Sequence, residues 1–207
     1  MAENRSAPTQ RLAPTPGQTV GPFFSYGTEY PRMHEVVTPH SPGSVLLGGT
    51  VYDGAGEPIP DAMIEIFGAD SDGSLPRARG AFRRDDHSFT GFGRSFTDRD
   101  GHYEFFTRNP GVRSAGAGEP EADDPGTRNG TPAAPFFATI VFARGLTDKL
   151  HTRIYLPDDA DALGADPFLA TLTAEERATL IARRGADGSL VHDIRLQGER
   201  ETVFLAF

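Results

Sequence analysis

Residues 48–73 read GGTVYDGAGEPIPDAMIEIFGADSDG, and the first strands of the fold can be recognised in this stretch. Two runs rich in apolar and β-branched residues, Val45–Tyr52 and Met63–Phe67, flank DGAG at 53–56, and DSDG follows at 70–73. Aspartate and glycine supply the side-chain turn bonds and positive φ angles that tight reversals need. The stretch therefore predicts two strands bounded by short turns.

The same pattern continues along the chain. The turn signals DRDG and ADGS occur at 98–101 and 186–189. Further strand-length runs are Tyr103–Thr107, Phe136–Ala143, Thr152–Leu156, Val191–Leu196 and Thr202–Phe207. Short strands separated by such turns are typical of a β-sandwich, so we expect a mainly β fold with long loops.

One helix is expected, at Ala174–Arg184. Thr173 and Glu176 form a capping-box pattern at its start, Leu180 contributes to an apolar side, and Gly185 follows its end. Nothing on this helix suggests chemistry, so we interpret it as a cover for one sheet face.

Composition limits the function classes. At 207 residues and 37% hydrophobic content, we expect a flexible arm at 1–18 and a single domain at 19–207, with a long Gly/Ala/Pro/Asp-rich loop at 112–133. The absence of cysteine excludes disulfides and thiolate metal sites. A net charge of −9, with no signal-like or membrane-length apolar run, favours a cytoplasmic protein with neither nucleic-acid nor membrane partners.

An arginine closes the most apolar stretch, PFFATIVFARG at 135–145. Such a run predicts a strand buried on both faces. An unpaired buried charge is costly, so Arg144 needs either access to solvent or an anionic partner.

Taken together with GRSFTDRDGHYEFFTRNPG at 93–111 and LHTRIYL at 150–156, the opening stretch resembles the intradiol aromatic ring-cleavage dioxygenases. TPGQTVGPFF at 15–24, ARGLTDKLHTRIYL at 143–156 and the final LQGERETVFLAF extend the likeness to nearly the whole chain. The resemblance implies a β-sandwich of the intradiol type. A silent transthyretin-like or carboxypeptidase-regulatory-like binding module shares part of the turn rhythm and is the main alternative.

Iron-binding members of that family hold a ferric ion with two tyrosinates and two histidines. The resemblance places Leu75, Arg113, Phe136 and Ala138 at those four positions. None of these side chains is a suitable ligand for ferric iron. We therefore expect this chain to bind no metal, which also argues against a single-chain catechol or hydroxyquinol dioxygenase.

The six histidines supply no substitute metal site by their spacing. No two of them are two or four residues apart; they stand at positions 34, 40, 87, 102, 151 and 192. His87, in DDH at 85–87, is the best spare metal candidate, although such a loop is usually solvated.

The resemblance implies a subunit that has lost its own iron site and works beside an iron-bearing partner chain of the same family, in a higher heteromer. Gly21, Pro22 and Arg144 match positions that border the partner's pocket in that family, and Arg144 would face the bound aromatic substrate. Phe23 stands where the family often has a hydroxylated aromatic residue. The implied reaction opens 3,4-dihydroxybenzoate with O2 to 3-carboxy-cis,cis-muconate, using Fe(III) held by the partner.

Two apolar segments at the ends of the chain are candidate interface elements. Phe23 and Phe24 belong to the first segment, and VFLAF at 203–207 is the second. Large exposed apolar patches usually mark interfaces, but VFLAF can equally complete the sandwich core.

Overall fold

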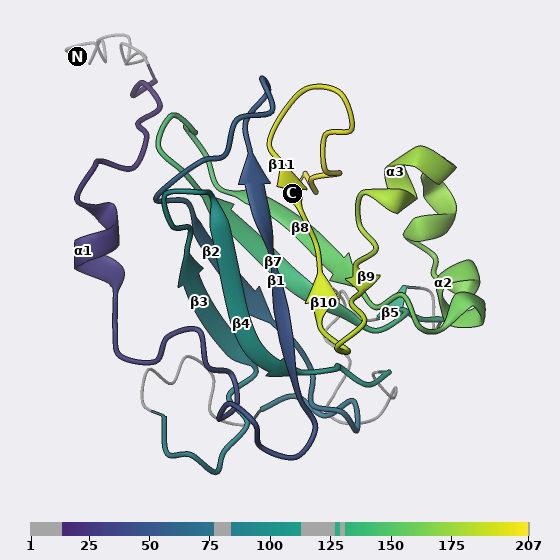
Figure 1. Ribbon diagram of the computed structural model, residues 1–207. Coiled ribbons are helices and arrows are strands. Elements are labelled where there is room, and N and C mark those ends of the chain that lie inside the picture. The colour runs from purple at the N-terminus through teal and green to yellow at the C-terminus, as the bar shows by residue number, and fades with distance from the viewer. Residues whose placement is uncertain (1–13, 77–83, 113–126, 129–130, 207) are drawn as a thin grey trace, which may run out of the picture.

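The computed structural model describes residues 14–76, 84–112, 127–128 and 131–206, and it contains two sheets packed face to face (Figure 1). The first sheet contains β1 (Ser44–Tyr52), β4 (His102–Arg108), β9 (Arg183–Arg184), β10 (Leu190–Val191) and β11 (Ile194–Arg195). The second has the order β3 (Phe92–Phe96), β2 (Met63–Phe67), β7 (Phe136–Phe142) and β8 (Leu150–Tyr155). A separate short pair joins β5 (Thr127–Arg128) and β6 (Thr131–Pro132).

Strand β1 organises the first sheet. It pairs antiparallel with β4 from Ser44 opposite Arg108 to Thr50 opposite His102. Its other edge pairs parallel with β10 and then with β11. In the second sheet, β2 pairs antiparallel with both β3 and β7, and β7 pairs with β8.

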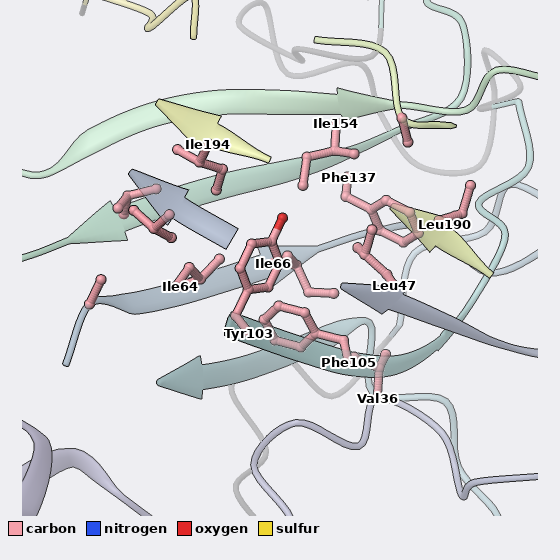
Figure 2. Packing of buried hydrophobic residues seen from close by; sticks show 14 of the residues in the cluster. Val36, Leu47, Ile64, Ile66, Tyr103, Phe105, Phe137, Ile154, Leu190 and Ile194 are labelled. Atoms are coloured by element: carbon pink, nitrogen blue, oxygen red, sulfur yellow. The ribbon is translucent and has the colours of Figure 1, made fainter. Parts of the chain in front are cut away.

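The inner faces of the two sheets form the main hydrophobic core (Figure 2). Leu47 and Tyr103 from the first sheet pack with Ile64, Phe137 and Ile154 from the second, and each is at most 1% exposed. Alternate residues of these strands point inward because successive side chains in a strand face opposite sides. This regular alternation confirms the expected β-sandwich.

Four short helical segments lie outside the sheets. They are α1 (Phe24–Thr28), α2 (Ala160–Ala165), the 3-10 helix η1 (Leu169–Thr171) and α3 (Ala174–Ala178). The predicted capping box at the start of α3 is confirmed, because the Thr173 hydroxyl accepts from the Glu176 N–H and the Glu176 carboxylate accepts from the Thr173 N–H. Figure 1 shows α1 on the opposite side of the sandwich from α2 and α3.

The expected length of the helix at Ala174–Arg184 is wrong, because α3 ends at Ala178. Leu180 accepts a hydrogen bond from the Tyr155 N–H at 2.8 Å, and the Ala182 N–H donates to the Tyr155 carbonyl at 3.0 Å. Backbone pairing to β8 therefore replaces the last helical turns. The remaining residues, Arg183 and Arg184, form β9.

Two other strand predictions need correction. The run Val191–Leu196 is split into β10 and β11. The Asp193 carboxylate accepts a hydrogen bond from the Thr50 N–H at 3.1 Å, and this bond interrupts the backbone pairing with β1. The predicted strand Thr202–Phe207 is an irregular segment over its described residues, with an isolated bridge at Leu205. Hydrogen bonds connect this segment to both sheets. Thr202 bonds to β11, and Val203 and Leu205 bond to β8.

Strand β3 was not expected from the sequence. Gly93 lies at its centre, and a Cβ at this position would approach Val36 and Phe105 to 2.7 and 2.9 Å. A residue that looks unfavourable for a strand is thus required by close packing between the sheets.

The division into an arm at 1–18 and a domain at 19–207 stays a prediction. Residues 1–13, most of the 112–133 loop and Phe207 lie outside the described residues. In the part of the chain that the structure describes, no helix has the length and apolar character to cross a bilayer.

Candidate functional site at residues 19–28 and the end of strand β7

The segment at residues 19–28, which contains Gly21 and Pro22, is held beside Arg144 by hydrogen bonds of Thr19. The Thr19 hydroxyl accepts a hydrogen bond from the Gly145 N–H at 2.7 Å and lies 3.5 Å from the Ala143 carbonyl oxygen. Thr19 therefore connects the segment at residues 19–28 to both residues that flank Arg144. Two segments that are far apart in the sequence are brought to one surface in this way.

Helix α1 anchors the other end of this segment on the outer face of the second sheet. Phe24 contacts the Phe142 ring at a centroid distance of 5.9 Å, and the Arg94 guanidinium donates to the Thr28 carbonyl at 2.6 Å. The same guanidinium pairs with Glu65 at 2.5 Å, and both of these side chains are about 15% exposed. Charge-assisted hydrogen bonds shielded from water hold α1 in place.

Arg144 has both a route to solvent and an anionic partner. Its side chain is 51% exposed, and its guanidinium lies 3.2 Å from the Asp61 carboxylate, which is 54% exposed. The prediction that this stretch is buried on both faces is wrong. Phe137, Thr139 and Val141 are buried in the core, while the intervening residues of β7 are only half-buried.

Two exposed aromatic residues border this surface. Phe23 and Tyr26 are each 77% exposed, and their rings lie 6.2 Å apart. Gly21 and Pro22 directly before them are also exposed, and the Gly21 carbonyl accepts from the Phe24 N–H at 3.1 Å. The surface thus combines a cation, a turn without bulky side chains and two aromatic rings.

The loops expected to carry the metal ligands meet at one end of the sandwich. Strand β2 ends at Phe67, which is paired with Ala138 on β7. In the turn that follows β2, the Asp70 carbonyl oxygen accepts a hydrogen bond from the Gly111 N–H at 2.9 Å. A Cβ on Gly111 would lie 2.3 Å from the Ser71 carbonyl oxygen, so only glycine allows this approach.

The residues at these positions do not fit a ferric ion. Leu75, Phe136 and Ala138 have no donor atoms in their side chains, and Arg113 lies outside the described residues. Arg153, paired with Ala138 in the register, places its guanidinium 4.3 Å from the Phe136 ring centroid and 5.0 Å from that of Phe168. A fixed positive charge at this point repels a metal cation.

A network of hydrogen bonds holds the Arg153 guanidinium in place. The Arg153 guanidinium donates to the Tyr155 hydroxyl at 2.9 Å, and that hydroxyl lies 3.4 Å from the buried Asp166 carboxylate. Burial raises the pKa of Tyr155 to about 12, so the phenol is protonated at neutral pH. Asp166 also accepts from the backbone N–H groups of Ala134, Phe168 and Leu169. The cluster is therefore a structural joint between β8 and the helical segments.

The spare metal candidate at 85–87 has a local structural role. Asp85 accepts from the backbone N–H groups of His87 and Ser88 at 3.0 and 2.7 Å and from the Ser88 hydroxyl. These bonds lower the pKa of the Asp85 carboxyl. Among the described residues, no group of three or more His, Cys, Asp or Glu side chains is arranged to hold a metal ion.

Comparison with known proteins identifies the class. Residues 20–198 match the sequence profile of the dioxygenase family. The chain belongs to this family, the intradiol dioxygenases, and not to the binding modules that share its turn rhythm.

Two relatives specify the closer similarity. The chain is 36% identical to the protocatechuate 3,4-dioxygenase alpha chain of Burkholderia cepacia, over 93% of this chain and 97% of the relative. It is 35% identical to the chain of the same name from Pseudomonas putida, over 97% and 100%. The beta chain from Burkholderia cepacia is 28% identical, over 69% of this chain and 57% of that chain.

Solved structures support the fold. Hydroxyquinol 1,2-dioxygenase from Pseudomonas putida DLL-E4 covers 90% of this chain and 68% of its own length, with a TM-score of 0.56 and 18% identity. The dioxygenase domain of a carbohydrate-binding fusion protein from Streptomyces sp. SirexAA-E covers 90% and 99%, with a TM-score of 0.52 and 24% identity.

Sequence reasoning missed several residues that shape this surface. Thr19, Asp61 and Arg153 act through contacts between segments that are distant in the chain, which no local pattern reveals. One signal was available for Asp61: it follows a Pro-x-Pro and adopts a φ of 63°, a conformation that aspartate tolerates better than most residues.

Proposed function

We propose that this chain is the alpha subunit of a protocatechuate 3,4-dioxygenase and that it completes the substrate pocket of an iron-bearing beta chain. The observation that carries the proposal is the surface on which Thr19 holds Gly21 and Pro22 beside the half-exposed Arg144. The names of the two relatives that align along nearly the whole chain support it, as does the alignment of a beta chain.

The proposed reaction is cleavage of 3,4-dihydroxybenzoate by O2 between its two hydroxylated carbons, giving 3-carboxy-cis,cis-muconate. The ferric ion and the oxygen chemistry belong to the partner chain, because the described residues at the family's ligand positions supply no donors. This chain contributes positive charge, the wall of the pocket and the exclusion of water.

Arg144 is the residue that binds the substrate in this proposal. A substrate with a carboxylate and ionised phenolic oxygens offers adjacent acceptors that suit the planar guanidinium. The present partner of Arg144 is a half-exposed carboxylate, and exposed ion pairs are weak. The guanidinium can therefore leave Asp61 for the substrate at small cost.

Gly21 and Pro22 form the wall of the pocket. Proline limits the backbone to a narrow φ range, and glycine lets a ligand approach the main chain closely. The bond from Gly145 to Thr19 keeps this wall in register with Arg144.

The segment at residues 19–28 is also the proposed interface with the beta chain. Phe23 and Tyr26 expose most of their rings, and aromatic residues are enriched at the centres of interfaces. Phe204 of the C-terminal segment packs against the chain's own core instead. We therefore assign association to the segment at residues 19–28 rather than to VFLAF, within a higher αβ heteromer in the cytoplasm.

The experiment is steady-state kinetics on the chain assembled with an iron-loaded beta chain. Arg144→Ala should lower kcat/KM about 10- to 150-fold, the equivalent of about 1.5–3 kcal/mol for a hydrogen bond to a charged group. Arg144→Lys should recover only part of the loss, because an ammonium lacks the planar fork.

The matched control is Arg99→Ala, which removes an exposed arginine from the turn at 98–101. It should change kcat/KM by less than about twofold, as surface substitutions usually do. Iron content is measured for every variant. An unchanged kcat/KM for Arg144→Ala at full iron loading refutes the proposed role, and failure of the two chains to associate refutes the assignment as a subunit.

A further inference from the structure

Helix α1 belongs to the candidate surface, yet its own sequence does little to stabilise it. The helix has five residues, and none of them is buried. Its N-cap residue, Phe23, makes no side-chain capping bond, and its first turn contains no acidic residue. Isolated helices shorter than about 12 residues are marginal in water. The order of α1 must therefore come from contacts with the rest of the fold.

The two faces of α1 have different surroundings. Phe24 and Thr28 are four residues apart, so they lie on one face of the helix. Phe24 contacts β7, and Thr28 contacts β3. Phe23 and Tyr26, which are three residues apart, are each 77% exposed. The exposed rings thus lie on the part of α1 that the second sheet does not cover.

Arg94 closes the C-terminal end of α1 from outside the helix. Thr28 is the last residue of α1, and its carbonyl oxygen accepts a hydrogen bond from Nη1 of Arg94 at 2.6 Å. The last carbonyl groups of a helix have no partner within it, and a cation beside them also interacts favourably with the helix dipole. The last turn of α1 contains no basic residue of its own. An arginine from β3 therefore supplies the missing cap.

Glu65 sets the direction of this guanidinium. Glu65 on β2 and Arg94 on β3 stand directly opposite each other in the register. One carboxylate oxygen of Glu65 accepts from Nε of Arg94 at 2.9 Å and from Nη2 at 2.5 Å, so Nη1 is directed to the Thr28 carbonyl. The Arg94 and Glu65 side chains are 14% and 15% exposed, so water competes little for these bonds. A cross-strand pair on a sheet thus fixes the donor that caps α1.

The same arginine also holds the chain that leaves α1. Glu29, the C-cap residue, has an extended backbone conformation and is followed by Tyr30. The centroid of the Tyr30 ring lies 5.6 Å from Cζ of Arg94 and 5.5 Å from Cζ of Arg84. The Arg84 guanidinium also donates to the Tyr30 hydroxyl at 3.3 Å. Cation–π contacts therefore fix the exit from the helix as well as its last carbonyl.

We propose that Arg94 is a positioning residue that orders α1 before the partner chain binds. With α1 fixed on the second sheet, Phe23 and Tyr26 form a preformed pair of rings, and association does not have to order the helix. A surface that is already ordered binds more tightly, because ordering during association opposes binding. This role rests on the proposed function, in which the surface meets an iron-bearing beta chain.

The variant that tests this role replaces both members of the ion pair, Glu65→Leu together with Arg94→Met. Replacing Arg94 alone would leave a poorly exposed carboxylate without its cation, whereas replacing both charges with apolar side chains usually costs little stability. The net charge stays at −9, so long-range attraction to a partner is unchanged. The contacts of Arg94 with Thr28 and Tyr30 are lost.

The matched control is Asp158→Asn together with Arg184→Met. Arg184 on β9 pairs with Asp158, and its Nη1 donates to the Gly188 carbonyl at 2.9 Å. This arrangement also combines an ion pair with a bond to a backbone carbonyl. Figure 1 shows β9 beside α2 and α3, away from α1. The control therefore removes an equivalent set of interactions that does not involve α1.

Hydrogen exchange of the full chain measures the order of α1. The Gly27 and Glu29 N–H groups donate to the Phe23 and Ser25 carbonyls. In the Glu65→Leu, Arg94→Met variant these two amides should exchange at least about tenfold faster than in the parent. In the control variant their exchange should change less than about twofold.

Sedimentation of the complex with the beta chain, on serial dilution, measures association. The dissociation constant should rise at least about tenfold in the Glu65→Leu, Arg94→Met variant and less than about twofold in the control. Arg94→Lys should give an intermediate value, because an ammonium keeps the charge beside Glu65 but lacks the planar fork that reaches Thr28 at the same time.

Arg94 does not have this role if the α1 amides exchange as slowly in its variant as in the parent. An equal rise of the dissociation constant in the control would also overturn it, because any lost ion pair would then weaken association. If the unmodified chain forms no complex with the beta chain, the proposed function fails, and the role of Arg94 toward the partner fails with it. A complex that forms normally and responds equally to both variants overturns the role of Arg94 alone.

Discussion

Asp61→Asn should raise the catalytic efficiency of the assembled enzyme. The Asp61 carboxylate pairs with Arg144 at 3.2 Å, and we propose that Arg144 must turn from this partner to the substrate. Asparagine is the appropriate replacement because residue 61 has a φ of 63°, which asparagine adopts readily. The change removes the charge while the backbone keeps its conformation.

The expected size of the effect follows from exposure. Both side chains are about half exposed, at 51% and 54%, and pairs of this kind contribute about 0.2–1 kcal/mol. If the whole of this energy is recovered when the substrate binds, kcat/KM rises by about 1.4- to 5-fold. The gain should shrink as salt is added, because the Debye length falls to about 8 Å at 0.15 M.

The assay is steady-state kinetics with 3,4-dihydroxybenzoate at several ionic strengths, with bound iron measured in each sample. Asp100→Asn, an exposed aspartate in the turn at 98–101, is the matched control and should leave kcat/KM unchanged. A decrease in kcat/KM for Asp61→Asn would refute the reasoning, because it would mean that Asp61 orients Arg144 for the substrate and does not compete with it.

Three further predictions concern the segment at residues 19–28, the core and the metal. Thr19→Val removes the acceptor for the Gly145 N–H and should lower kcat/KM about 2- to 10-fold, with faster hydrogen exchange in residues 19–28. Tyr103→Phe removes the donor to the buried His192 carbonyl at 2.7 Å and should reduce the free energy of unfolding by about 1–3 kcal/mol, whereas Tyr26→Phe, at an exposed position, should have no effect. Burial raises the pKa of Tyr103, so the folded chain holds this proton more tightly; its contribution to stability falls as pH rises above about 10, and the difference between the parent and Tyr103→Phe should narrow there. The isolated chain should contain no stoichiometric iron by elemental analysis; one iron per chain with visible charge-transfer absorption would contradict the lack of suitable ligands at the family's positions.

Local sequence pattern was sufficient for the β-sandwich. Val45–Tyr52 and Met63–Phe67 coincide closely with β1 and β2, because a short run of apolar and β-branched residues bounded by Asp/Gly turns indicates both a strand and its ends. The capping box at Thr173 was also visible, since both of its hydrogen bonds are made within four consecutive residues. Two further inferences depended on aligning the ordered motifs with those of the family. They are the lack of suitable iron ligands at the family's positions and the choice of Arg144 as a candidate site residue.

Tertiary structure decided what depends on contacts between distant segments. Pairing with Tyr155 ended the helix at Ala178, although the sequence that follows is rich in residues that favour a helix. Close packing at Gly93 made a strand from a sequence with a weak strand signal. The partners of Arg144 and the burial of His192 could not be predicted from the sequence either. The charge state and the neighbours of a side chain depend on which segments the fold brings against it, and that information is not local in the chain.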